Sequence, residues 1–354
     1  MALNVYFATN RLVKKDGSNP EIGDDFHPNL DELRFGKVAF SGRDLFKKQL
    51  DAFMDKGQIT LAPEKLDKED ADKSKLGSKA IFDEVRAEML AKGDAVIMVH
   101  GYNYTFREAA ARAAQLQQWL AAGGKDMVML LFTWPSAGAG VGVRTYHDDR
   151  KRAETSGLAL GRAILKAADF IRNTPRAERC EGRVHLLCHS MGNWALRGAV
   201  QAMRTYVGNN IPPLFDEVVL IAADEDDDTL QTGHKIAPIL RGCRRTTVYY
   251  NHQDLALKAS DYAMGNPDRL GRSGPDADAE LPNKVAVVNV SPSIIRAAKG
   301  ANAWQADPSG HQYYRNNPRV RQDLVQVLHG KLDEDFLEEG QRRGNDFGGY
   351  WRLT

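Results

Sequence analysis

The chain has 354 residues, of which 42% are hydrophobic and 27% are charged, as is ordinary for a folded globular protein. Its 48 Lys and Arg balance 47 Asp and Glu, and the net charge of +1 predicts no global attraction to nucleic acid or to an anionic membrane. Three cysteines, Cys180, Cys188 and Cys243, are too few and too irregularly spaced for a disulfide framework or a zinc site.

The first residues of the chain do not resemble a targeting segment. Residues 1 to 11 lack a basic start followed by an apolar run of about 7–15 residues, which a secretory signal needs. No stretch approaches the ~18 apolar residues that cross a bilayer. We therefore expect a cytoplasmic protein that does not act at a membrane.

Short runs rich in apolar and β-branched residues predict the strands. Several, such as Ala95–Val99 and Val218–Ala222, are continuously apolar, as expected of a strand covered by helices on both faces. The predicted strands are Val5–Thr9, Lys37–Ser41, Ala95–Val99, Val128–Phe132, Val184–Cys188, Val218–Ala222, Thr246–Tyr250 and Lys284–Val290.

Helical patterns separate most of these strands. The predicted helices are Asp83–Lys92, Thr105–Ala122, Arg152–Asn173, Asn193–Val207, Asp228–Arg241 and Pro318–Leu332. Alternating strands and helices predict an α/β fold, with a mostly parallel sheet of about eight strands and helices on both faces. The first two strands precede any long helix and are expected to form an antiparallel lead-in.

Neither an internal repeat nor a linker divides the chain, so residues 1–354 are predicted to form a single domain. Residues 259–282 hold glycine, proline and aspartate over a length that is unusual for a loop, which predicts a lid or entrance loop. Residues 340–354 carry three aromatic residues among glycines. This segment is either a docked arm or a contact to a second subunit in a homo-oligomer.

The most informative stretch runs from residue 183 to residue 193. An apolar strand stops at His189-Ser190-Met191-Gly192, and a helical sequence follows. Such a sharp strand-to-helix turn lifts a serine out of the sheet edge as a nucleophile, and it needs small residues on either side. Gly192 meets this need, while Cys188 stands where glycine is usual and is merely small.

A nucleophilic serine requires a base and an acid that orients the base. In this architecture they follow in the order serine, acid, histidine, each after a late strand. Asp254 follows the strand Thr246–Tyr250, and His311 lies between the last strand and the last helix. We therefore predict a triad of Ser190, Asp254 and His311, with two alternatives open. Asp254 could instead cap the turn Leu255–Ser260, and Asp224 could supply the acid.

Donors for an oxyanion should come from the residue after the nucleophile and from the loop after the third strand. These are the amides of Met191 and Tyr102, with Asn103 as the alternative to Tyr102. His100 begins this loop and is expected to shape it, because no set of metal ligands surrounds it. Trp134 is predicted either to floor an acyl pocket or to pack the loop after its strand.

Taken together, these motifs resemble the α/β-hydrolase superfamily in its esterase and lipase branch, and within it a bacterial subgroup. The resemblance runs from about residue 3 to about residue 332. It rests on Tyr6-Phe7-Ala8-Thr9-Asn10-Arg11, His100-Gly101-Tyr102-Asn103, Thr133-Trp134-Pro135-Ser136, His189-Ser190-Met191-Gly192-Asn193, Asp254-Leu255-Ala256-Leu257 and Gly310-His311-Gln312-Tyr313. It implies hydrolysis of carboxylic esters without a metal or an organic cofactor.

The expected activity is that of a carboxylesterase on a small-molecule ester, with an acyl-enzyme on Ser190. An amidase, thioesterase, lactonase or acyltransferase would use the same residues, so these stay open. A catalytically silent binding protein of the same fold is a third hypothesis. It is disfavoured because all three positions of the triad are filled.

Overall fold

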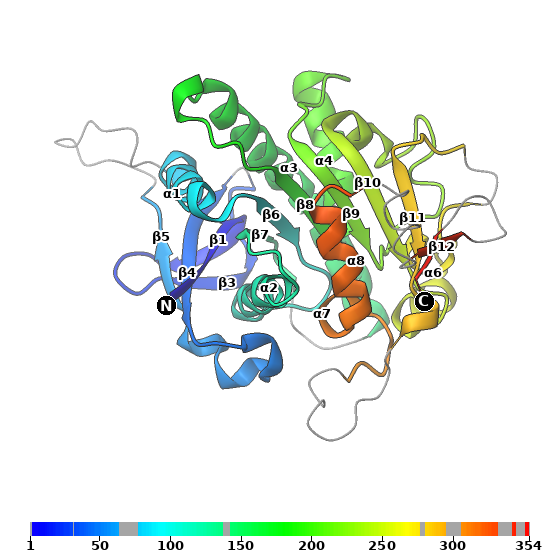
Figure 1. Cartoon of the computed structure of the whole chain (residues 1–354). Coiled ribbons are helices and arrows are strands. Elements are labelled where there is room, and N and C mark those ends of the chain that lie inside the picture. The colour runs from blue at the N-terminus through cyan, green and yellow to red at the C-terminus, as the bar shows by residue number, and fades with distance from the viewer. Residues whose placement is uncertain are drawn as a thin grey trace.

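One large sheet forms the centre of the structure, a computed structural model that describes residues 2–30, 32–63, 77–136, 142–276, 280–294, 306–331, 342–344 and 351–353 (Figure 1). Within these residues the sheet has eleven strands in the order β12-β13-β11-β10-β9-β8-β6-β7-β1-β4-β5. They are β1 (Ala2–Thr9), β4 (Arg34–Ser41), β5 (Gln58–Leu61), β6 (Ala95–Val99), β7 (Val128–Thr133), β8 (Val184–His189), β9 (Phe215–Ile221), β10 (Cys243–Tyr250), β11 (Val285–Asn289), β12 (Arg342–Gly344) and β13 (Trp351–Leu353).

Most neighbouring strands run parallel, as predicted. The parallel pairs extend without a break from β1 through β7, β6, β8, β9, β10 and β11 to β13. Strand β4 is antiparallel to β1, and β5 is antiparallel to β4. The expected antiparallel lead-in is therefore only half right, because β1 also pairs parallel with β7 in the body of the sheet.

All eight predicted strands are present, and the estimate of about eight was too low. The sequence did not predict strands β5, β12 and β13, which lie at the ends of the sheet. Each has only three or four residues, too few to show an alternating or continuous apolar pattern. A separate antiparallel pair, β2 (Arg11–Lys15) and β3 (Glu21–Phe26), was also missed. Its residues are mostly charged, so composition favoured a loop.

Helices cover both faces of the sheet (Figure 1). Helices α1 (Gly77–Lys92), α3 (Val143–Asn173) and α4 (Gly192–Val207) pack on one face, and α2 (Phe106–Ala121) and α8 (Pro318–Leu328) pack on the other. Within β6, Ala95, Ile97 and Val99 enter the first core, while Val96 and Met98 enter the second. Burial on both faces explains why this strand is continuously apolar.

The predicted helix at Asp228–Arg241 is wrong. This segment forms turns, followed by a short 3-10 helix at Ala237–Gly242. Gly233 has a φ of 86°, in the left-handed region, which interrupts a helix. Acidic side chains at the start of this segment form ion pairs, including Asp228 with Lys235 at 3.3 Å.

The predicted lid segment 259–282 contains regular structure. It includes the end of α5 (Leu255–Met264) and all of α6 (Leu270–Ser273). Arg269, just before α6, is fully buried and forms an ion pair with Asp226, which anchors this part of the segment. Residues 277–279 of the segment lie outside the described residues.

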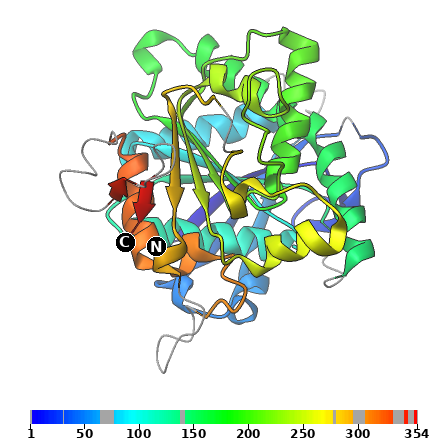
Figure 2. The same cartoon turned by 90° about the vertical axis from the view of Figure 1, so that its right-hand side faces the viewer.

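The described residues of the C-terminal segment 340–354 form strands at the sheet edge (Figure 2). Trp351 of β13 pairs parallel with Val288 of β11, and β12 pairs with β13. The pairing of β12 and β13 with the sheet favours the docked arm over the subunit contact for residues 342–344 and 351–353. Residues 340–341, 345–350 and 354 lie outside the described part of the chain. Among the described helices none is both long and apolar enough to span a bilayer.

Candidate active site

Ser190 occupies a strained turn between β8 and α4. Its φ is 53°, which places a non-glycine residue in the left-handed region, and such strain persists only where the surroundings enforce it. The Ser190 amide donates to the Ile221 carbonyl at 3.0 Å. The Ser190 carbonyl accepts from the Asp224 amide at 3.2 Å and from Asn193 Nδ2 at 2.9 Å. These backbone contacts hold the turn without using the Ser190 hydroxyl.

Two glycines permit the close approach of backbone around Ser190. A Cβ on Gly101 would lie 2.9 Å from the Ser190 Cβ, and a Cβ on Gly192 would lie 2.6 Å from the Val99 carbonyl oxygen. Cys188, which stands where glycine is usual, is fully buried, and burial raises the pKa of its thiol. Cys188 therefore acts as a small core residue and does not prevent the strained conformation of Ser190.

His311 and Asp254 are joined by a short hydrogen bond. His311 Nδ1 lies 2.6 Å from Asp254 Oδ2, and Asp254 is fully buried. Burial lowers the pKa of His311, but the nearby Asp254 charge and this hydrogen bond outweigh burial and raise that pKa above its ordinary value. Because Nδ1 is engaged, Nε2 is the nitrogen left to exchange a proton.

Asp254 both caps a helix and contacts His311. Its Oδ1 accepts from the Leu257 amide at 2.9 Å and caps α5, while Oδ2 binds His311. The cap fixes the carboxylate and thereby fixes the ring that it orients.

Asp224 belongs to a different set of contacts. Its Oδ2 accepts from the Tyr146 hydroxyl at 2.9 Å, its Oδ1 accepts from Ser260 Oγ at 2.8 Å, and Arg269 lies 3.9 Å away. The structure therefore brings Asp254, rather than Asp224, into contact with the imidazole of His311.

His189 connects the serine turn to the histidine loop. Its ring lies 4.8 Å from the His311 ring and 4.6 Å from the Tyr314 ring, centre to centre. Its Nε2 donates to the His311 carbonyl at 3.3 Å, and burial keeps the pKa of His189 well below its ordinary value. A neutral His189 thus places His311 beside the Ser190 turn, which the sequence pattern alone did not show.

Of the predicted oxyanion donors, Met191 directly follows Ser190 in the chain and Tyr102 directly follows Gly101, which approaches Ser190. Met191 is the N-cap of α4, at the positive end of the helix dipole. Tyr102 follows Gly101, which touches Ser190, and its hydroxyl bonds Thr145 Oγ1 at 2.8 Å. The alternative donor, Asn103, uses its amide to bind Ser136 Oγ at 2.6 Å. That hydrogen bond favours Tyr102 over Asn103.

His100, at the start of the loop after β6, packs against Trp134, which follows β7. Their rings stack at 5.1 Å, and neither residue is exposed. His100 Nδ1 donates to the Gly101 carbonyl at 2.8 Å, while its Nε2 accepts from the Trp134 amide at 3.2 Å. Burial lowers the pKa of His100 to about 3 and keeps it neutral. These contacts favour loop packing, rather than an acyl-pocket floor, for Trp134.

Arg11 also holds the loop after β6, through the Tyr104 carbonyl. It is fully buried, and its guanidinium donates to Thr133 Oγ1 at 3.0 Å, to Asp24 Oδ1 at 2.8 Å and to the Tyr104 carbonyl at 2.8 Å. Burial lowers its pKa to about 10, which still leaves it charged near neutral pH. In the sequence Arg11 stands out only as part of a motif, and its contacts give that motif a structural role.

We expect Arg11→Lys to lower the free energy of unfolding by roughly 2–4 kcal/mol, because one ammonium cannot donate to all three acceptors of the guanidinium and leaves at least one of them unpaired. Urea denaturation measures this loss. Arg152→Lys is the matched control, since its ion pair with Asp25 is at the surface and should be worth less than about 1 kcal/mol. Equal losses in the two variants would contradict a structural role for Arg11.

Within the described residues, no group of three or more His, Cys, Asp or Glu side chains is placed to hold a metal ion. A mainly parallel sheet between two helical layers, with a strained serine at the strand-to-helix turn, defines the α/β-hydrolase class. The chain belongs to the family described as alpha/beta hydrolase of unknown function (DUF900), whose model matches residues 78–328. No curated protein matches the chain.

Proposed function

We propose that the protein is a serine carboxylesterase of the esterase and lipase branch. The observation that carries the proposal is the 2.6 Å hydrogen bond between His311 Nδ1 and Asp254 Oδ2 beside the strained Ser190. An imidazole held by a buried carboxylate next to a strained serine is the arrangement that activates a hydroxyl for acyl transfer.

In the proposed reaction Ser190 Oγ attacks the ester carbonyl carbon while His311 Nε2 accepts the hydroxyl proton. The amides of Met191 and Tyr102 stabilise the oxyanion of the tetrahedral intermediate. When the intermediate collapses, the C–O bond to the alcohol breaks and His311 returns the proton to that alcohol. A water then attacks the acyl-enzyme with His311 as base, which releases the carboxylic acid and restores Ser190.

A fluorophosphonate probe and a series of p-nitrophenyl esters with increasing acyl length test the proposal. We expect stoichiometric labelling at Ser190 and turnover of at least the shorter esters, because these reagents require only an activated serine and an oxyanion site. Absence of labelling would overturn the proposal. Labelling without ester turnover would move the assignment to an amide or thioester substrate, which a parallel substrate panel identifies.

The pH profile should report the ionisation of His311. The base must be neutral to accept a proton, so kcat/KM should fall as the pH drops through the pKa of the free enzyme. Since the pKa of His311 is raised, the midpoint of this acid limb should lie above 6.5. A measured midpoint below 6.5 would contradict the proposed pairing with Asp254.

A further inference from the structure

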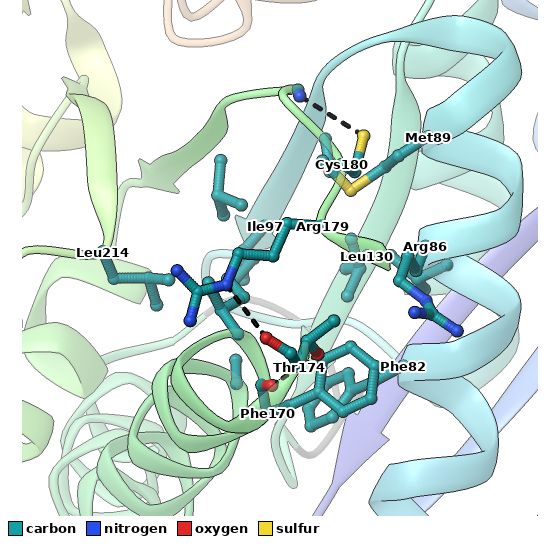
Figure 3. Close-up of a pocket in the computed structure, with 16 residues that line it drawn as sticks. Phe82, Arg86, Met89, Ile97, Leu130, Phe170, Thr174, Arg179, Cys180 and Leu214 are labelled. Carbon is teal, nitrogen blue, oxygen red and sulfur yellow. Dashed lines mark hydrogen bonds between the residues drawn. The ribbon is translucent and has the colours of Figure 1, made fainter. Parts of the chain in front are cut away.

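An apolar cavity of about 130 Å³ lies between α1 and α3 at the edge where the parallel strands begin (Figure 3). Its lining includes Ala95 and Val184, the first residues of β6 and β8, whereas Ser190 directly follows the end of β8. At about 3.3 Å per residue, the six positions from Val184 to Ser190 span roughly 20 Å. The cavity is therefore separate from the candidate active site.

The cavity has the size and the lining that suit one ring or a short alkyl chain. Its apolar wall includes Phe82, Met89, Ile97, Leu130, Ala167 and Phe170. A dry protein cavity of about 150 Å³ with a comparable lining accepts benzene. An apolar group of that size would fill the space between the helices and the sheet.

The guanidinium of Arg179, an exposed residue, lines the cavity. Figure 3 shows the side chain of Arg179 directed toward Thr174, where its Nε donates to the Thr174 carbonyl at 3.0 Å. Its Nη2 donates to the Arg172 carbonyl at 2.9 Å, and no ion pair joins Arg179 to a carboxylate within the described residues. Neighbouring Arg86 differs, because Glu178 at 2.9 Å neutralises it. Arg179 thus presents a positive charge, held by two backbone carbonyls, beside an apolar interior.

We propose that this cavity binds a small monocarboxylic acid, with its aryl or short alkyl group inside and its carboxylate against Arg179. Burial of the apolar group provides affinity, and the guanidinium selects an anion over a neutral molecule of the same shape. This binding site does not depend on the proposed esterase function.

Calorimetric titration with phenylacetate and with its neutral counterpart benzyl alcohol tests the proposal. For ligands of this size we expect a Kd for phenylacetate of roughly 0.1–1 mM. Arg179→Gln should weaken phenylacetate about tenfold while changing benzyl alcohol less than about twofold. Arg176→Gln is the matched control, because Arg176 is exposed in the same segment and does not line the cavity. Equal effects of the two variants would overturn the role of Arg179.

Two further measurements locate the bound molecule. Ala167→Phe fills the cavity and should abolish binding of both ligands while leaving hydrolysis of esters unchanged. Cys180 lines the cavity and is half-buried, whereas Cys188 and Cys243 are buried, so phenylacetate should slow modification of Cys180 by a thiol reagent several-fold. Undiminished binding to Ala167→Phe, or Cys180 modification unaffected by phenylacetate, would overturn the site. The Cys180 readout also serves if Ala167→Phe fails to fold.

Discussion

Replacing Ser190 with alanine should lower kcat for ester hydrolysis by roughly 10³-fold or more, because no other group near the turn is proposed to form the acyl-enzyme. The fold should persist. The contacts that hold this turn run through the Ser190 backbone amide and carbonyl, and alanine keeps both. The measurement is kcat on a p-nitrophenyl ester, with the urea midpoint recorded for the same preparation.

Ser293→Ala is the control for the loss of a buried hydroxyl. Ser293 Oγ donates to the Val290 carbonyl and touches none of the three proposed catalytic side chains, so its loss should change kcat by less than about threefold. If kcat of Ser190→Ala falls only a few-fold, Ser190 is not the nucleophile, because an enzyme of this type that lacks its nucleophile loses far more activity.

The second large effect is expected from Asp254→Asn, which should lower kcat by roughly 10³–10⁴-fold. An amide in place of the carboxylate no longer stabilises the imidazolium and favours the wrong tautomer of His311. The fold should again persist, because the asparagine Oδ1 can still accept from the Leu257 amide and cap α5. Loss of the Asp254 charge should also move the acid limb of the residual activity to lower pH.

Asp224→Asn is the matched comparison, because Asp224 was the alternative acid in the sequence and is buried near Ser190. Its carboxylate binds Tyr146 and Ser260 rather than His311. We expect kcat to fall less than about tenfold in this variant. A larger loss in Asp224→Asn than in Asp254→Asn would reverse the assignment of the acid.

The strands of the sheet were predictable because a strand that is buried on both faces has a continuously apolar sequence. In β6, side chains that alternate between two cores must all be apolar, so five consecutive apolar residues suffice. The same reasoning fails for β12 and β13, which have three residues each. It also fails for residues 228–241, where acidic side chains form ion pairs rather than support a helix.

The sequence by itself determined the class of fold and the three candidate catalytic positions. A strand that ends at a small-residue turn before a helix, and an ordered acid and histidine after later strands, are local features. It left the acid open between Asp224 and Asp254, because both follow strands that end at the same sheet edge. Only the tertiary structure paired His311 with a carboxylate 57 positions away.

The structure likewise decided what the sequence motifs do. Arg11 donates a hydrogen bond to the Tyr104 carbonyl in the loop after β6, 93 positions away in the chain. The His189 ring packs against the ring of His311, 122 positions away. Such contacts depend on how distant segments approach one another once the sheet has formed. Residue type and local spacing therefore predicted which groups are available, while packing decided which of them meet.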